Sequence, residues 1–153
     1  DNRIQFLKGD LRNKNWLDQI FIDYNKSNKS IKFVIHFAGL KSIYSSIKNP
    51  LEYWNMNITS TLSLLEVMKK NDCFDLIFSS SATVYKPITS RLLKETDVLE
   101  PTTPYGRTKL CIEKILKDLY DSDRNWRIAN LRYFNPIGSH PSGHLLENPK
   151  AMS

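Results

Sequence analysis

The sequence predicts an α/β fold in which a doubly wound parallel sheet carries helices on both faces. Short β-rich runs alternate along the chain with longer segments of helical periodicity. Four such runs separated by three helical segments give the order βαβαβαβ, and helical crossovers between strands imply parallel pairing. One domain is expected, because 153 residues are too few for two full ones.

The chain opens with a predicted strand, a turn and a helix. Ile4 to Leu7 forms the strand, and Gly9-Asp10 forms the turn. The helix is predicted by apolar residues at i, i+3, i+4 and i+7, which are Leu17, Ile20, Phe21 and Tyr24. The next apolar run, Phe33 to Phe37, is typical of a strand buried on both faces of a parallel sheet.

A second helix is predicted to begin at Asn49-Pro50. Asn49 suits the N-cap, Pro50 the first position, and Glu52 completes a capping box. Its apolar stripe is expected to comprise Leu51, Trp54, Ile58, Leu62, Leu65 and Met68.

The second half of the chain repeats the pattern. A strand is predicted from Phe74 to Ser79, and after a long loop Thr103-Pro104 opens a helix. The inward residues of this helix are expected to be Ile112, Ile115, Leu116 and Leu119. Trp126 to Tyr133 predicts the fourth strand.

Composition excludes several classes of protein. With 41% hydrophobic and 25% charged residues, the chain is neither fibrous nor disordered, and no apolar run reaches the ~20 residues of a membrane span. The net charge of +6 is spread over scattered lysines without an arginine-rich block, so we expect no nucleic-acid partner. Two cysteines, Cys73 and Cys111, suggest reduced thiols in a cytoplasmic protein.

Tyr105 and Lys109 are the first candidates for chemistry. They stand four residues apart at the start of the predicted helix 104–119, and therefore on one face. A lysine ammonium one turn away favours the phenolate, so we expect the pKa of Tyr105 to be depressed. The pair would then move a proton to or from an alcohol. Ordinary amphipathic spacing is the alternative explanation.

The serine run Ser79-Ser80-Ser81 strengthens that reading. It follows a buried strand, at the end of the sheet where open α/β folds bind ligands. A polar strand end with local hydrogen bonds is the alternative. A serine, a tyrosine and a lysine in this order resemble the catalytic set of the short-chain dehydrogenase/reductase superfamily, in its extended, sugar-nucleotide branch.

Further motifs narrow the resemblance to the UDP-glucose 4-epimerase family. The runs that match it in order and spacing cover essentially the whole chain: Val34 to Lys41, Asn57, Ser79 to Tyr85, Pro104 to Lys109, Leu131 to Pro136, and His140 to Gly143. Related dehydratases usually carry an Asp-Glu pair where this chain has Ala82-Thr83.

The resemblance implies a role for each matching residue. Tyr105 is the implied catalytic base, Lys109 lowers its pKa and binds the nicotinamide ribose, and Ser81 orients the sugar. Asn135 is an implied substrate contact. The implied cofactor contacts, besides Tyr105 and Lys109, are Asp10, Leu11, Phe37, Ala38, Gly39, Leu40, Lys41, Asn57 and Phe134. Independently, Asn57 interrupts an apolar stripe, so its amide is expected to have a partner.

The implied activity is the interconversion of UDP-glucose and UDP-galactose through a 4-keto sugar on bound NAD. The resemblance also implies a homodimer, without a membrane or nucleic-acid partner. Two alternatives stay open: an epimerase for another nucleotide sugar, such as UDP-N-acetylglucosamine, and a non-catalytic binding module. No metal site is expected, and His36 is interpreted as a core or strand-end histidine.

The sequence lacks one expected feature of this fold, the glycine-rich turn that holds a pyrophosphate. No G-x-x-G-x-x-G occurs among its five glycines. In the family that the chain resembles, this turn follows the first strand, and Asp1 falls just before the third. The resemblance therefore implies that residues 1–153 are part of a Rossmann-like NAD-binding domain, without its first two strands and without the C-terminal substrate domain. The chain opens without methionine and ends in a loop-like tail over 143–153, which fits a middle fragment.

Overall fold

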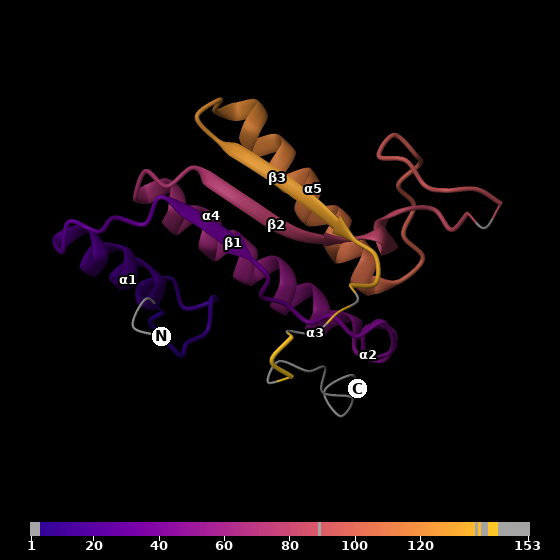
Figure 1. Cartoon of the computed structure of the whole chain (residues 1–153), viewed down its shortest axis with the longest axis horizontal. Helices are drawn as coiled ribbons and strands as arrows, with labels where there is room; N and C mark the ends of the chain where they lie inside the picture. Colours follow the sequence, from indigo (N-terminus) through magenta and orange to yellow (C-terminus); the bar gives the residue numbers. More distant parts are fainter. Residues whose placement is uncertain (1–3, 89, 137, 139–140, 144–153) are drawn as a thin grey trace.

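The computed structural model describes residues 4–88, 90–136, 138 and 141–143, and shows a parallel sheet backed by a layer of helices (Figure 1). The loop-like tail expected over 143–153 lies outside the described residues, apart from Gly143. Within the described ranges, no helix is long and apolar enough to cross a membrane.

The sheet has three strands in the order β1-β2-β3. They are β1 (Phe33–His36), β2 (Asp75–Ser81) and β3 (Arg127–Tyr133), and both pairings are parallel. The register places Ser81 opposite Tyr133, so both strands end at the same edge. The expected parallel pairing of the last three strands is confirmed. β2 runs two residues beyond the predicted Ser79 and carries Ser80 and Ser81 within the strand.

The helices connect these strands. Their bounds are α1 Lys14–Lys26, α2 Ile43–Lys48, α3 Pro50–Trp54, α4 Ser60–Lys70 and α5 Pro104–Ser122, with a π-helical turn η1 at Asn55–Thr59 and a 3₁₀ turn η2 at Ala82–Val84. The predicted start of α5 is confirmed, since the Thr103 side chain accepts a hydrogen bond from the Gly106 N–H at 3.2 Å.

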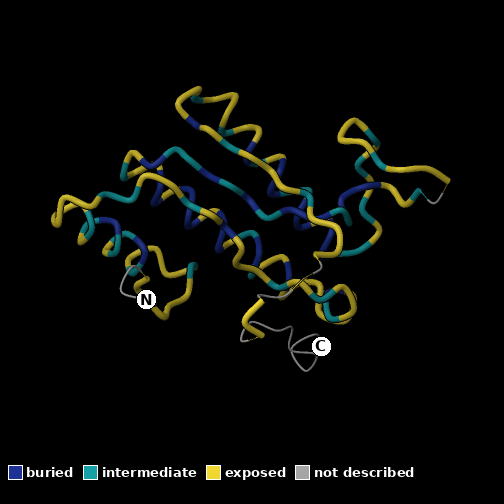
Figure 2. Tube along the Cα trace, in the orientation of Figure 1, coloured by how far each residue is buried: buried dark blue, intermediate teal, exposed yellow. Residues whose placement is uncertain are grey.

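Helices cover only one face of the described sheet, so the expectation of helices on both faces is wrong here. Burial alternates along β2 (Figure 2). Leu76 is 1% exposed on the face that the helices cover, whereas Ile35 on the opposite face is 52% exposed. The reason is the strand order. Right-handed crossovers that proceed in one direction place every connecting helix on the same face.

For the same reason, the prediction that the run from Phe33 to Phe37 is buried on both faces is wrong. Only His36 of β1 is buried, and the run leaves the sheet after it. The predicted strand from Ile4 to Leu7 is also absent, and these residues are exposed and irregular. A strand needs a neighbour for its backbone groups, and no described strand pairs with this segment.

The helix predicted from Asn49 differs in three respects. The expected capping box is wrong, because the Asn49 side chain makes no cap hydrogen bond, although Pro50 does stand at the first position. A short helix, α2, precedes it and was not predicted; Ser42 caps it. The π-helical turn then shifts the buried face, and Leu51 of the predicted stripe is 83% exposed.

The core lies between β2 and the helices α1, α4 and α5. Phe74 packs edge-on against Trp126, with ring centroids 5.3 Å apart. The buried cluster is formed by Leu17, Phe21, Leu64, Leu65, Val67, Met68, Cys73, Leu76, Phe78, Ile112, Leu116 and Trp126. Both cysteines are free. This core fixes the carboxyl end of β2 against the first turns of α5.

Candidate active site

A cavity of about 830 Å³ opens at the carboxyl ends of the strands. Its volume suits a small-molecule site, and its position is the one where open α/β sheets bind ligands. It is lined by Phe37, Gly39, Lys41, Ile43, Ser79, Ser80, Ser81, Thr83, Tyr105, Lys109, Tyr133, Phe134, Asn135 and Pro136.

Ser81 is held as a hydrogen-bond donor. It ends β2 and caps η2, so that its Oγ accepts from the Thr83 N–H at 3.2 Å and from the Thr83 hydroxyl at 2.9 Å. A serine hydroxyl has two acceptor lone pairs and one proton. Both lone pairs are used by Thr83, which leaves the Ser81 proton to be donated.

Tyr105 reaches Ser81 because α5 approaches η2 closely. A Cβ at Gly106 would stand 2.6 Å from the Thr83 carbonyl oxygen and 2.9 Å from Pro101 Cβ. Only glycine leaves room for this approach. The first turn of α5 therefore lies directly on the turn that follows the serine run.

Lys109 is buried one helical turn after Tyr105. Its Nζ donates to the Ser79 carbonyl oxygen at 2.8 Å, and lies 4.8 Å from the Phe78 ring centroid and 5.8 Å from that of Tyr105. Desolvation lowers the pKa of Lys109 to about 8. The charge of this lysine is thus adjustable near neutral pH.

The expected depression of the Tyr105 pKa is wrong for the described chain. Burial raises the pKa of Tyr105, a hydrogen bond with Ser81 opposes that rise, and the phenol of Tyr53 adds to it. The ammonium of Lys109 lies beside the ring and donates to the β2 backbone. Desolvation of the phenolate is therefore the largest influence on the Tyr105 pKa, and it outweighs the hydrogen bond with Ser81.

Asn57 holds the loop from Phe37 to Lys41 through hydrogen bonds to the Leu40 backbone. Asn57 Oδ1 accepts from the Leu40 N–H at 2.8 Å, and its Nδ2 donates to the Leu40 carbonyl at 3.1 Å and to Thr108 Oγ1 at 3.1 Å. A hydrogen-bond partner for this amide was predicted, and its partners are Leu40 and Thr108 of the same chain. The role of Asn57 as a cofactor contact stays a prediction.

Gly39 sits where that loop passes closest to Asn57. Its φ is +149°, and a Cβ there would lie 3.0 Å from Asn57 Oδ1. Gly39 lines the cavity together with Phe37 and Lys41, whereas the predicted contacts Ala38 and Leu40 do not.

Of the remaining predicted residues, two line the cavity and two lie near the start of the chain. Phe134 and Asn135 line the cavity, but Asp10 and Leu11 do not. Asp10 forms an exposed turn with Arg12, whose guanidinium and N–H lower the pKa of that carboxyl to about 2. The structure brings together Ser81, Tyr105 and Lys109, and their roles remain predictions.

Six cavity residues were not assigned a site role by the sequence analysis: Ile43, Ser79, Ser80, Thr83, Tyr133 and Pro136. Thr83 and Tyr133 lie within quoted motifs, and strand alternation offers a signal for Tyr133. It is the outward-facing residue at the end of β3, and its ring centroid lies 6.4 Å from that of Phe37. Ile43 belongs to α2, which has no clear sequence pattern.

Comparison with known families agrees with this geometry. The NAD dependent epimerase/dehydratase family matches residues 1–151. The chain belongs to this family. Members that it resembles include UDP-glucose 4-epimerase 1 of Oryza sativa subsp. japonica, 49% identical over 148 residues, which make up 97% of this chain and 40% of that protein. The UDP-glucose 4-epimerase of Dictyostelium discoideum is 50% identical over 147 residues, covering 96% of this chain and 41% of that protein.

A solved structure of the same family shares the fold. UDP-glucose 4-epimerase from Bifidobacterium longum, crystallised with NAD⁺ and UDP, superposes with a TM-score of 0.86 at 45% identity. The match covers 94% of this chain and 42% of that one. The Rossmann-like α/β class is thereby confirmed, with three strands described. The chain spans about 40% of the length of the relatives that it matches.

Proposed function

We propose that this chain supplies the catalytic centre of a UDP-glucose 4-epimerase, which interconverts UDP-glucose and UDP-galactose through a 4-keto sugar. One observation carries the proposal. Ser81, Tyr105 and Lys109 come from a strand end and a helix start, and they line a single cavity. A hydroxyl donor, a phenol and an ammonium are the groups needed to move one alcohol proton.

In this proposal Tyr105 takes the proton of the sugar C4 hydroxyl and later returns it. Ser81 donates its one proton to the Tyr105 oxygen before substrate binds and to the reacting sugar oxygen afterwards, since Thr83 already occupies its lone pairs. Lys109 supplies positive charge beside the phenol. Because burial raises the pKa of Tyr105, the positive charge of Lys109 is needed to favour the phenolate once the Ser81 proton is given to the sugar.

The cavity residues fit the nicotinamide end of NAD, which when bound accepts the hydride from C4 and gives it back. Phe37 and Phe134 offer apolar rings, and Gly39 lets the backbone approach closely. Lys109 keeps N–H donors beyond the one given to Ser79 for a ribose hydroxyl. Asn135 lies at the same cavity and is assigned to the sugar nucleotide. We further propose a cytoplasmic homodimer for the complete enzyme.

The test is an epimerase assay on the complete protein that carries this chain. We expect UDP-galactose to be converted to UDP-glucose, and slower or no conversion of UDP-N-acetylglucosamine. Conversion of the N-acetylated sugar alone would reassign the substrate. Binding of the nucleotide sugar without any conversion of either sugar would support a non-catalytic module instead.

His36, at the end of β1, provides a pH-dependent prediction for the same protein. Its ring is 2% exposed, and its Nε2 lies 3.0 Å from Thr61 Oγ1. Burial, with a smaller effect of the Lys109 charge, lowers its pKa to about 4. The unfolded chain therefore binds a proton near pH 6.5, and the folded chain binds it only near pH 4. The stability that this difference provides is complete above pH 6.5 and is lost as the pH falls to 4.

We expect His36→Gln to flatten this acid dependence. Between pH 7.5 and pH 4, the free energy of unfolding should fall by about 3 kcal/mol more in the parent than in the variant. Urea unfolding at both pH values measures the difference. Equal acid sensitivity of the two proteins would show that His36 does not carry it.

A further inference from the structure

A buried ion pair joins α5 to β3, the strand that pairs with the Ser81-bearing strand β2. Glu113 lies on α5, one turn after Lys109, and Arg132 lies on β3. Arg132 Nε donates to Glu113 Oε1 at 3.0 Å and Arg132 Nη2 to Oε2 at 2.7 Å, forming a two-pronged contact. The side chains are 6% exposed for Glu113 and 19% exposed for Arg132.

β2, which carries Ser80, is joined to the same carboxylate. Ser80 Oγ donates to Glu113 Oε1 at 2.5 Å, so one buried carboxylate contacts β2, α5 and β3. Each of these three residues lies next to a cavity residue, either in sequence or one helical turn away. Ser80 precedes Ser81, Arg132 precedes Tyr133, and Glu113 follows Lys109 by four residues.

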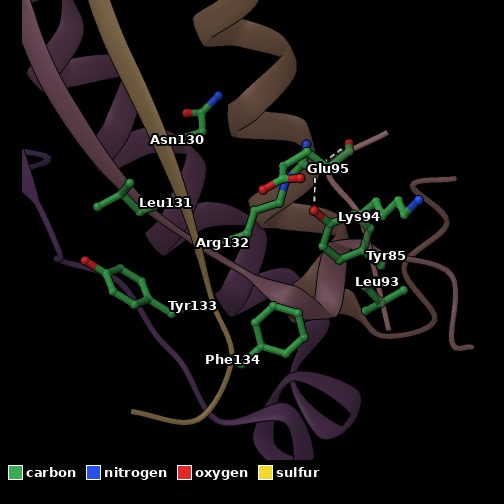
Figure 3. A pocket seen from close by; sticks show the side chains of 9 residues that line it. All are labelled: Tyr85, Leu93, Lys94, Glu95, Asn130, Leu131, Arg132, Tyr133 and Phe134. Carbon is green, nitrogen blue, oxygen red and sulfur yellow. Dashed lines mark hydrogen bonds between the residues drawn. The ribbon is translucent and has the colours of Figure 1, made fainter. Parts of the chain in front are cut away.

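Arg132 also binds the segment that follows η2. Figure 3 shows its guanidinium reaching Tyr85 and Glu95 at a second pocket of about 570 Å³. Arg132 Nη1 donates to Tyr85 Oη at 2.9 Å and to the Glu95 carbonyl oxygen at 3.3 Å. Tyr85 follows directly on the turn whose Thr83 holds Ser81.

We propose that Glu113, Arg132 and Ser80 form a positioning brace that sets the separation of Ser81 and Tyr105 for proton transfer. The inference rests on the proposed function. None of the three is a catalytic residue in this proposal, because they act through the elements they join. Glu113 and Arg132 do not line the cavity.

A second ion pair joins the same two strands and provides a comparison for the brace. Arg127 of β3 forms a two-pronged contact with Asp75 of β2 at the opposite end of the sheet. That pair is solvent-accessible, with side chains 74% and 24% exposed. A buried ion pair is weak evidence for stability because both charges lose water on burial, and we assign this one a geometric role.

The two pairs allow a matched experiment in the complete protein. Glu113→Gln/Arg132→Met removes the brace, and Asp75→Asn/Arg127→Met removes the pair at the far end; both changes conserve net charge. We expect the brace variant to lose about 100-fold in kcat, as expected for a misplacement of about 1 Å, with KM for UDP-galactose near the parent value. The Asp75/Arg127 variant should keep the parent kcat.

Where the double variant does not fold, Arg132→Lys replaces it, because lysine keeps the charge and loses the planar fork. This single change should also lower kcat and leave KM near the parent value. A fall in kcat of equal size in both pair variants, or a kcat near the parent value in the brace variant, overturns the proposal.

The titration of Tyr105 gives a readout that does not depend on turnover. The hydrogen bond with Ser81 opposes the rise in the Tyr105 pKa, so displacing Ser81 should raise that pKa further. The other titratable or charged groups around the described site are Tyr53 on α3, His36 on β1, Lys109 on α5, Lys41 in the loop after β1 and Tyr133 on β3. None of these is altered in either variant.

¹³C-tyrosine NMR of the complete protein measures the Tyr105 pKa. We expect an upward shift in the brace variant and none in the Asp75/Arg127 variant. An inactive parent protein would refute the proposed epimerase function, and the brace would then be judged by this shift alone. No shift in the brace variant would refute the brace.

Discussion

Replacement of Tyr105 by phenylalanine in the complete protein should lower kcat by about 10²–10⁴-fold, the usual contribution of a positioned acid–base group. The change removes one oxygen, at the point where α5 meets the end of β2. Because the ring remains and fills the same buried space, NAD should stay bound. Epimerase assays with UDP-galactose and the NAD content of the purified protein measure the two effects.

Tyr120→Phe is the matched control for this prediction. Tyr120 lies on the same helix, and its half-exposed ring stacks on Arg124 with the guanidinium carbon 4.3 Å from the centroid. The same atom is removed without contact with the cavity, so activity should stay at the parent value. Undiminished turnover in Tyr105→Phe would remove the phenol from the mechanism.

Much of the fold was accessible from local patterns. The helical period of α1, the Thr103-Pro104 start of α5 and the apolar runs of β2 and β3 are properties of short segments. The prediction of a strand from Ile4 to Leu7 was wrong because a strand depends on a neighbour that periodicity does not reveal. The helices also lie on one face for a topological reason, the direction of the crossovers, which no single segment encodes.

The site was predictable where residues lie close in sequence or follow a strand. The spacing of Tyr105 and Lys109, and the place of Ser81 after a buried run, were enough to expect a shared cavity. The direction of the Tyr105 pKa shift was not predictable, because desolvation depends on how deeply the ring is packed. Glu113 was missed as well, although a carboxylate on the buried face of α5, four residues after Lys109, is a signal that alone would have suggested a buried partner.

The uncovered face of the sheet leads to the remaining prediction. Opposite the helices, Phe33, Ile35 and Leu131 are exposed, and so are Phe37 and Phe134 beyond the strand ends. β1 also forms an edge of the described sheet. Contiguous apolar surface next to a strand edge is a surface for association. The sequence also lacks the glycine-rich turn that would hold the pyrophosphate of NAD.

Expressed alone, residues 1–153 should therefore self-associate and should neither bind NAD tightly nor epimerise. Sedimentation velocity measures the association, and calorimetric titration with NAD measures binding. Ile35→Thr with Leu131→Thr should reduce association by removing apolar groups from the bare face. Leu92→Thr, which changes a solvent-exposed leucine on a loop, should leave association unchanged. A monomer that unfolds cooperatively and binds NAD at micromolar concentration would contradict this prediction, since it would mean that three strands and one helical layer are sufficient for a stable cofactor site.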